Sequence, residues 1–276
     1  MTRHATALLL ILFASAALAP RAAGAGQQPA EKTIPDKVKL FIPYKAYSQE
    51  DNQRILDMYK YLRVADVSDG MDAVGLQDVG LVDPEIHALW KDTDGFTHRV
   101  VGIAVTARYM PTNRREPKMD DKTIGQWYST VTSEAFMDVL APGSMLMIDA
   151  MEDGESRSIG SSNIQSWQKR GMIGLVTSGG LADTDEIIHQ KVPVYFRRLA
   201  RGIRPGRNEL ESVNRPVTIG GVLVRPGDVV MADGDGVVVV PRERAVEVAN
   251  AALPFLDNIA RQRYIKETGK NPWKKH

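Results

Sequence analysis

Apolar residues gather in three long runs in the middle of the chain. The run RVVGIAVTARY (99–109) is rich in β-branched residues, and two more follow in LAPGSMLMIDA (140–150) and MIGLVTSGG (172–180). Continuous runs of this kind are typical of strands that are buried on both faces. The last run breaks at two glycines and leads into LADTDEI, where three acids fall within four positions. Such a strand-to-helix junction can present a ligand or a metal ion, and it is equally an ordinary way to start a helix.

Helical periodicity is present on both sides of these runs. Residues 47–62 (YSQEDNQRILDMYKYL) predict an amphipathic helix, with Ser48 and Asp51 at the spacing of a capping box. Its apolar face comprises Ile55, Leu56, Met58, Tyr59 and Leu62. Residues 161–171 predict a short helix that starts at serine and ends at glycine, and residues 183–191 predict one with acids in its first turn.

The last third of the chain has a different pattern. Residues 215–241 (RPVTIGGVLVRPGDVVMADGDGVVVVP) are short apolar runs separated by glycine-rich turns, which predicts a β-meander. Residues 242–264 then predict a long helix that is kinked or interrupted at Pro254. Strands mixed with helices and followed by hairpins indicate a single α/β domain in which helices cover β-layers.

The N-terminus carries a targeting pattern. A short basic start (MTRH), an apolar run (ALLLILFASAALA) and the A-x-A site Ala23-Gly24-Ala25 predict a secretory signal peptide over residues 1–25. Residues 26–45 are interpreted as a flexible lead-in, and residues 46–276 as the folded domain. We therefore expect a secreted or periplasmic protein without a stable membrane span after cleavage. The alternative is an uncleaved membrane anchor.

Composition narrows the classes of partner and chemistry. Hydrophobic residues make up 43% of the 276 residues and the formal net charge is +1, which argues against a nucleic-acid partner. The one basic cluster, residues 269–276, is interpreted as a solvated tail. The chain has no cysteine, which excludes thiol catalysis and cysteine-ligated metals. An exported chain without disulfides must depend on a sizeable apolar core.

Most signatures of catalytic sites are absent. The chain has no HExxH, no G-x-S-x-G elbow, no P-loop and no G-x-G-x-x-G, and its five histidines lie far apart. Carboxylates remain, in a cluster at 66–72 and in a second cluster at 183–186. Carboxylates without histidine suit a hard cation such as Mg²⁺, which keeps several waters and takes one or two protein ligands. The alternative for Asp183 and Asp185 is N-capping and dipole complementarity at a helix start.

Several segments resemble the RraA-like family. They are VADVSDGMDAVG (64–75), VVGIAVTA (100–107), APGSMLMIDA (141–150), RGMIGLVTSGGLADTDEI (170–187), VPVYFR (192–197) and VTIGGVLVRPGDVVMADGDGVVVVP (217–241). That family includes class II 4-hydroxy-4-methyl-2-oxoglutarate aldolases, oxaloacetate decarboxylases and proteins named as regulators of ribonuclease activity. The resemblance implies an αββα sandwich, assembled as a homotrimer or as a hexamer of two trimers, with active sites between subunits.

The resemblance also implies the place of a site. In the family's enzymes, backbone N–H groups at a helix start help to hold the substrate. Further along the chain, an Arg-Asp pair grips the substrate carboxylate and ligates a divalent metal that acts as a Lewis acid. The matching helix start is Gly160-Ser161-Ser162-Asn163, and the matching pair is Ala182-Asp183. The resemblance therefore implies that Asp183 is the ligand of Mg²⁺ or Mn²⁺ and that Gly160 to Asn163 and Ala182 lie at the substrate.

This sequence departs from the family's pattern at three positions. Ala182 replaces the arginine, Ser161 replaces an acid, and Ser178 replaces the aspartate of a turn. Loss of one oriented donor at a charge-stabilising site typically costs about 10²–10³ in rate. Arg157, which lies just before Gly160, is the best-placed substitute by sequence. Its other interpretation is a solvated loop arginine.

Two functions remain open. The first is a metal-dependent carbon–carbon lyase, an aldolase or decarboxylase that acts on a small anionic 2-oxo acid through a metal-bound enolate. Asp183 and Arg157 would be its catalytic residues, and acids of the 66–72 cluster or Asp257 of a neighbouring subunit would hold metal-bound water. The second is a family scaffold that has lost catalysis and serves as an exported binding or assembly protein. Export disfavours inhibition of a ribonuclease, and the lack of a glycine-rich cofactor loop disfavours methyl transfer.

Overall fold

The computed structural model describes residues 45–116, 118–150 and 154–274. The predicted signal peptide, and the predicted lead-in up to residue 44, lie outside the described residues. The described residues belong to one structural unit, residues 42–276. None of the helices in this described part is long and apolar enough to cross a membrane.

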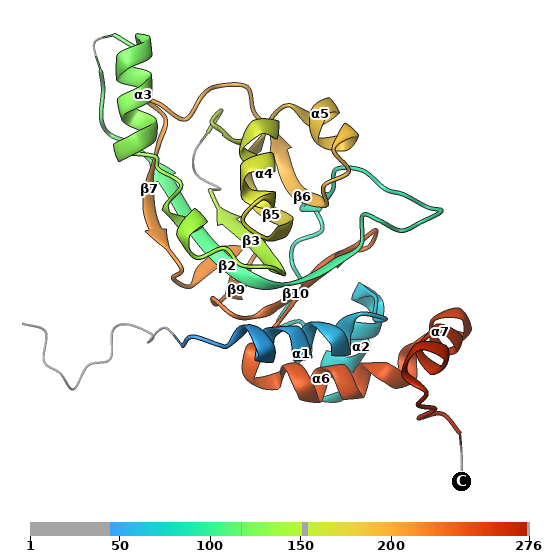
Figure 1. Cartoon of the computed structure of the whole chain (residues 1–276). Coiled ribbons are helices and arrows are strands. Elements are labelled where there is room, and N and C mark those ends of the chain that lie inside the picture. Colours follow the sequence, from blue (N-terminus) through green and yellow to red (C-terminus); the bar gives the residue numbers. More distant parts are fainter. Residues whose placement is uncertain (1–44, 117, 151–153, 275–276) are drawn as a thin grey trace, which may run out of the picture. The chain divides into compact units, whose positions relative to one another are not determined.

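A mixed sheet forms the frame of this unit (Figure 1). Its strands are β1 (His87–Ala88), β2 (Val100–Pro111), β3 (Ser144–Asp149), β4 (Arg157–Ile159), β5 (Met172–Leu181), β6 (Val194–Leu199), β7 (Asn208–Val213), β10 (Val229–Asp233) and β11 (Gly236–Val240). The spatial order is β1-β6-β5-β3-β2-β10-β11, with β4 beside β5 and β7 beside β2. Strands β2, β3, β5 and β6 are mutually parallel, and the antiparallel hairpin β10–β11 extends the sheet from β2.

The segment from residue 81 to residue 88 connects the two ends of this sheet. Leu81 forms an antiparallel bridge with Val238 of β11, and the backbone N–H of Val82 donates to the carbonyl of Val237 at 3.1 Å. The same segment ends in β1, which pairs with β6. The sheet is therefore nearly closed. Its interior is filled by apolar side chains of β2, β3, β5, β6, β10 and β11 and of the separate hairpin β8 (Val217–Ile219) and β9 (Val222–Val224).

Helices cover the sheet from outside. They are α1 (Gln49–Tyr59), α2 (Val64–Ala73), α3 (Asp121–Thr130), α4 (Ser161–Gln168), α5 (Thr184–His189), α6 (Ala245–Ala252) and α7 (Asn258–Thr268). One apolar core joins α1, α2 and α6 to β2, β10 and β11, and another joins α4 and α5 to β2, β3, β5 and β6. Figure 1 shows the two groups of helices on opposite sides of the sheet. This is the arrangement that the predicted αββα sandwich requires.

A close contact between α2 and α6 depends on one glycine. A Cβ atom built on Gly70 would lie 2.8 Å from the Cβ of Ala252, closer than carbon atoms approach in proteins. Glycine at this position therefore lets the two helix backbones approach, which places the acid-rich helix α2 firmly on the β10–β11 side of the unit.

Most predicted elements are confirmed. The three apolar runs are β2, β3 and β5, the predicted helices are α1, α4 and α5, and Ser48 caps α1 by accepting from the N–H of Asp51 at 3.1 Å. The final helix is interrupted at Pro254, where the 3-10 turn η3 (Leu253–Phe255) separates α6 from α7.

Two predictions about strands were wrong. The third run does not break at Gly179 and Gly180, because β5 continues to Leu181 while its pairing with β6 shifts register across these glycines. The C-terminal strands do not form one meander either. The hairpin β8–β9 is a separate two-stranded sheet, whereas β10–β11 joins the main sheet. Local turn residues predicted both hairpins, but they carry no information about which distant strand each one meets.

Candidate functional site

Asp183 lies at the junction between β5 and α5. Its backbone is in the left-handed region, with φ 53° and ψ 41°, a conformation that aspartate and asparagine adopt more readily than most residues. Its carbonyl accepts from the N–H of Ile187 at 3.0 Å, so its main chain starts α5. Its carboxylate, however, makes no capping hydrogen bond to that helix. Asp185 and Glu186 do lie in the first turn of α5, as dipole complementarity predicts.

The carboxylate of Asp183 instead reaches the start of α4. Its Oδ2 accepts from the backbone N–H of Ser161 at 3.1 Å and lies 3.4 Å from the Ser161 hydroxyl. The N-cap residue of α4 is Gly160, which has no side chain with which to cap the helix. A Cβ on Gly160 would lie 2.7 Å from this carboxylate oxygen. The absence of a side chain at Gly160 therefore lets Asp183 cap α4 from across the site.

Arg157 also belongs to this site. Strand β4 pairs with the end of β5, and the N–H of Ala182 donates to the carbonyl of Ile159 at 3.1 Å. This pairing brings Arg157 Nη1 to 3.8 Å from Asp183 Oδ1. Both side chains are partly exposed, at 41% and 36%, so the pair contributes little to stability. No residue in the described ranges accepts a hydrogen bond from the Arg157 guanidinium. The structure thus brings together Arg157, Gly160, Ser161, Ala182 and Asp183, five of the predicted residues.

The other predicted residues of α4 play different parts. The Asn163 side chain donates to Glu134 Oε1 at 2.6 Å, and the indole N–H of Trp167 donates to Glu134 Oε2 at 2.8 Å. Glu134 in turn lies 3.2 Å from Nη1 of Arg204, which is buried. The Asn163 amide is therefore committed to holding α4 in place. Ser162 is exposed at the first turn of α4.

A comparison with family models matches residues 64–239 to the family described as RraA-like, Aldolase/RraA. This range covers β2, β3, β5, β6, β10 and most of β11 together with the Asp183 junction. The chain belongs to the RraA-like family. The predicted family is therefore confirmed.

Curated relatives share this family at low identity. Protein DlpA of Legionella pneumophila is 27% identical over 191 residues, which are 68% of this chain and 28% of DlpA. A protein of Halalkalibacterium halodurans, provisionally named 4-hydroxy-4-methyl-2-oxoglutarate aldolase, is 29% identical over 130 residues, which are 46% of this chain and 60% of the relative. The matched part is thus less than two thirds of each of these relatives.

Solved structures of similar fold support the architecture. An uncharacterised protein from Pseudomonas syringae pv. tomato superposes with a TM-score of 0.60 at 25% identity, covering 84% of this chain and 95% of that one. Streptomyces coelicolor RraAS2, described as an unusual member of the RNase ES inhibitor RraA family, superposes with a TM-score of 0.59 at 22% identity, covering 78% and 97%. Their likeness confirms the mixed α/β fold with helices around a nearly closed sheet.

The donor set of this RraA-like site fits a hydrated divalent cation held through one carboxylate. Oδ2 of Asp183 accepts from the N–H of Ser161, whereas the contact of Oδ1 within the described residues is with the guanidinium of Arg157 at 3.8 Å. Mg²⁺ and Mn²⁺ accept such an arrangement, since Mg²⁺ in particular keeps several waters and takes one or two protein carboxylates. Among the described residues, no three His, Asp or Glu side chains converge into a closed metal cage.

The other acids proposed for the metal shell lie elsewhere in the chain. Asp66 is buried at the start of α2, where it accepts from the backbone and the guanidinium of Arg63. Asp257 caps α7 through the N–H of Ala260, and this hydrogen bond holds the pKa of its carboxyl below the usual value. Asp69 and Asp72 are exposed on α2. Within one chain none of these acids contacts Asp183, so a shared metal shell requires a second subunit.

Sequence reasoning missed a polar cluster at the end of β3, where it meets β5. Ser178 is buried in β5 rather than placed in a turn; its hydroxyl accepts from the N–H of Ala150 at 3.0 Å and lies 3.4 Å from Asp149 Oδ1. Asp149 Oδ2 lies 3.6 Å from Arg108 Nε. An aspartate that ends a fully apolar strand was the signal available in MLMID. Glu134 and Arg204 gave no such signal, because they lie outside any recognisable motif.

Proposed function

We propose that this RraA-like protein is an exported carbon–carbon lyase that cleaves a small anionic 2-oxo acid with the help of Mg²⁺ or Mn²⁺. The proposal rests on one observation above all: Asp183 and Arg157 meet at the start of α4. The provisional aldolase name of the Halalkalibacterium relative supports the reaction class. The N-terminal sequence supports export to the periplasm or medium, and the family supports a homotrimer or hexamer.

The residues at the junction suit separate tasks. Asp183 would hold the metal through Oδ1, directly or through one of its waters. The metal would polarise the 2-oxo group as a Lewis acid. Arg157 can turn from its loose contact with Asp183 to form paired hydrogen bonds with the substrate carboxylate. The N–H groups of Ser162 and Asn163 at the positive end of α4 can hold a second anionic group.

Cleavage would break the bond between the third and fourth carbons of the 2-oxo acid. The electron pair stays on the pyruvyl fragment as an enolate, and the charge of Arg157 stabilises it. Protonation from water then gives pyruvate. The other fragment leaves as a second 2-oxo acid when the fourth carbon carries a hydroxyl, which loses its proton, or as carbon dioxide from oxaloacetate. Because Ala182 offers no guanidinium, we expect turnover about 10²–10³ below that of a site with both donors.

Pyruvate release tests this proposal. The mature chain would be assayed with 4-hydroxy-4-methyl-2-oxoglutarate and with oxaloacetate, each with Mg²⁺, with Mn²⁺ and with a chelator. Asp183→Asn should abolish metal-dependent release, because an amide keeps an acceptor for Ser161 but is a poor ligand for a hard cation. Asp185→Asn, in the first turn of α5, is the matched control. Turnover no higher than that of the metal alone would contradict the proposal.

A second candidate is a scaffold without catalysis that serves as an exported binding or assembly protein. It is favoured by Ala182 and by the Ser161 N–H, which Asp183 already occupies and which is therefore unavailable to a substrate. Ala182→Arg separates the two candidates. A gain in pyruvate release would contradict the scaffold, whereas no gain together with metal-independent stability would favour it.

A further inference from the structure

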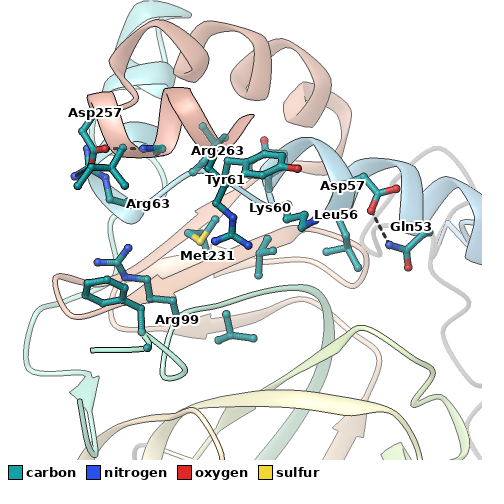
Figure 2. Close-up of a pocket in the computed structure, with 18 residues that line it drawn as sticks. Gln53, Leu56, Asp57, Lys60, Tyr61, Arg63, Arg99, Met231, Asp257 and Arg263 are labelled. Carbon is teal, nitrogen blue, oxygen red and sulfur yellow. Dashed lines mark hydrogen bonds and ion pairs between the residues drawn. The ribbon is translucent and has the colours of Figure 1, made fainter. Parts of the chain in front are cut away.

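A cavity of about 730 Å³ lies on the side of the sheet that α1, α2 and α6 cover (Figure 2). It is enclosed by the connection between α1 and α2, by the first turns of α7 and by the segment from residue 95 to residue 101. It shares no lining residue with the Asp183 site. Its volume falls in the range of about 300–1,000 Å³ that is usual for sites of small organic ligands.

The floor of this cavity is apolar. It is formed by Leu56 of α1, Val101 of β2 and Met231 of β10, of which Leu56 and Met231 are buried. The rings of Tyr61 and Phe96 contribute to the walls, and Phe96 is 44% exposed. An exposed phenylalanine beside a hollow with an apolar floor gives a ligand two apolar surfaces to cover.

Two guanidinium groups reach into the same cavity with unused donors. Arg99 stacks on Phe96, with 3.9 Å between its guanidinium carbon and the ring centre, and no described residue accepts a hydrogen bond from its guanidinium. Arg263 donates from Nε to Glu267 Oε1 at 2.9 Å, while its two terminal nitrogens have no acceptor among the described residues. Figure 2 shows the end of Arg263 beside Met231, whereas the end of Arg99 lies apart from it, on the side of Arg63.

Within the described part of the chain, the acids at the rim accept no hydrogen bond from Arg99 or Arg263, although the charges of Arg63 and Arg99 both act on Asp257. Asp257 pairs with Arg63 at 3.0 Å, and the N–H of Ala260 already donates to it. Asp57 accepts from the side-chain amide of Gln53 at 2.9 Å. A guanidinium group pairs best with a carboxylate, through two parallel hydrogen bonds. An anionic group that enters the cavity can therefore pair with the guanidinium of Arg99 or with that of Arg263.

We propose that this cavity binds a small organic carboxylate with an aromatic or alkyl body. The carboxylate accepts hydrogen bonds from Arg99 or Arg263, and the body lies on Leu56 and Met231 against the ring of Phe96. The ligand is thus distinguished from inorganic anions by its apolar part and from neutral apolar molecules by its charge. Within one chain this cavity shares no residue with the Asp183 junction, so the proposal does not depend on the proposed lyase activity.

Calorimetric titration of the mature chain tests this assignment with phenylacetate as the probe. Phenylacetamide, its uncharged analogue, and inorganic phosphate, an anion without an apolar body, are the two chemical controls. Phenylacetate should bind at least about tenfold more tightly than either control, which corresponds to one guanidinium–carboxylate contact or to the burial of one ring. Equal affinity for phenylacetate and phenylacetamide, or no binding of phenylacetate, would overturn the proposal.

Substitutions in the lining of the cavity test whether phenylacetate binds there. The double variant Arg99→Gln/Arg263→Gln should weaken phenylacetate at least about tenfold while leaving phenylacetamide unchanged. Phe96→Ala should weaken both. Arg215→Gln, at an exposed arginine outside this cavity, and Asp183→Asn, in the other site, should bind phenylacetate as the wild type does. Unchanged affinity in the double variant would overturn the proposal, and the comparison of probes on the wild type decides it even where a variant fails to fold.

Discussion

The carboxylate of Asp183 and the backbone N–H of Ser161 are joined by a hydrogen bond of 3.1 Å. This bond ties the start of α5 to the start of α4. The residue proposed to ligate a metal is therefore also the cap of a neighbouring helix, and the two roles use different oxygens of one carboxylate. An amide can replace the capping oxygen but not the metal ligand. Substitutions at Asp183 can therefore separate structure from function.

The first prediction concerns the stability of variants at Asp183. Asp183→Ala should lower the free energy of unfolding by about 1–2 kcal/mol, because it removes a helix cap and places alanine in the left-handed region. Asp183→Asn should lower it by less than about 0.5 kcal/mol, since asparagine both caps and tolerates that backbone conformation. Urea unfolding measures both values. Equal losses in the two variants would show that the 3.1 Å bond contributes nothing.

The second prediction compares two glycines. Gly160→Ala places a Cβ 2.7 Å from Asp183 Oδ2, so the carboxylate must leave the start of α4, at a cost of about 1 kcal/mol. Gly125→Ala, inside α3, meets nothing within 4 Å and should stabilise the chain by about 0.5–1 kcal/mol through helix propensity. The expected changes have opposite signs. Thermal unfolding of the two variants measures both changes. Stabilisation of Gly160→Ala as well as Gly125→Ala would contradict the predicted clash with Asp183.

The fold was predictable where neighbours in sequence decide it. Apolar runs predicted β2, β3 and β5, and serine at position 48 predicted the start of α1. The bridge between Leu81 and Val238 nearly closes the sheet, and neither local sequence predicted it. The helix at 64–73 was not predicted, because its aspartates were interpreted as a possible metal-binding cluster. Asp66 in fact serves the helix start, together with Arg63.

The candidate site was predictable only through the family resemblance. The pattern before and after Asp183 allowed capping of its own helix, and nothing in the spacing indicated that its carboxylate would cap α4 instead. That contact depends on the parallel pairing of β4 with β5, which brings Gly160 beside residue 183. Likewise, nothing in the local sequence indicated that the side-chain amide of Asn163 would donate to Glu134, which is 29 residues away in the chain.

The third prediction concerns this buried support of α4. Glu134→Ala removes the carboxylate that lies 3.2 Å from Arg204, whose side chain is only 2% exposed. Because an uncompensated charge then stays buried, the free energy of unfolding should fall by about 3 kcal/mol. Glu155→Ala breaks the exposed pair with Arg201 and should cost less than about 0.5 kcal/mol. Losses of similar size in urea unfolding would mean that Glu134 is not the support of Arg204.

The fourth prediction concerns the pH dependence of stability through Asp228. Asp228 is 3% exposed, and burial raises the pKa of its carboxyl to about 6 from the ordinary 3.8. The N–H groups of Arg225 and Arg242 donate to its oxygens at 2.7 Å and 3.0 Å, which opposes this rise. The folded chain therefore binds this proton more tightly than the unfolded chain. Between pH 4 and pH 6 the folded state holds more protons, so this group's contribution to stability falls as pH rises.

The rise in the pKa of Asp228 from 3.8 to about 6 corresponds to roughly 3 kcal/mol of the free energy of unfolding. The folded protein is destabilised by this amount above pH 6, where Asp228 is charged, and not at all below pH 4, where it is protonated in both states. In the Asp228→Asn variant this position cannot titrate. One carboxylate oxygen becomes an NH₂ group that faces a backbone N–H, so the variant is destabilised by the same amount at every pH. Urea unfolding of both proteins from pH 4 to pH 7 should show the wild type losing its advantage over the variant as pH rises. Parallel curves would mean that Asp228 is charged throughout this range and that its two backbone donors outweigh its burial.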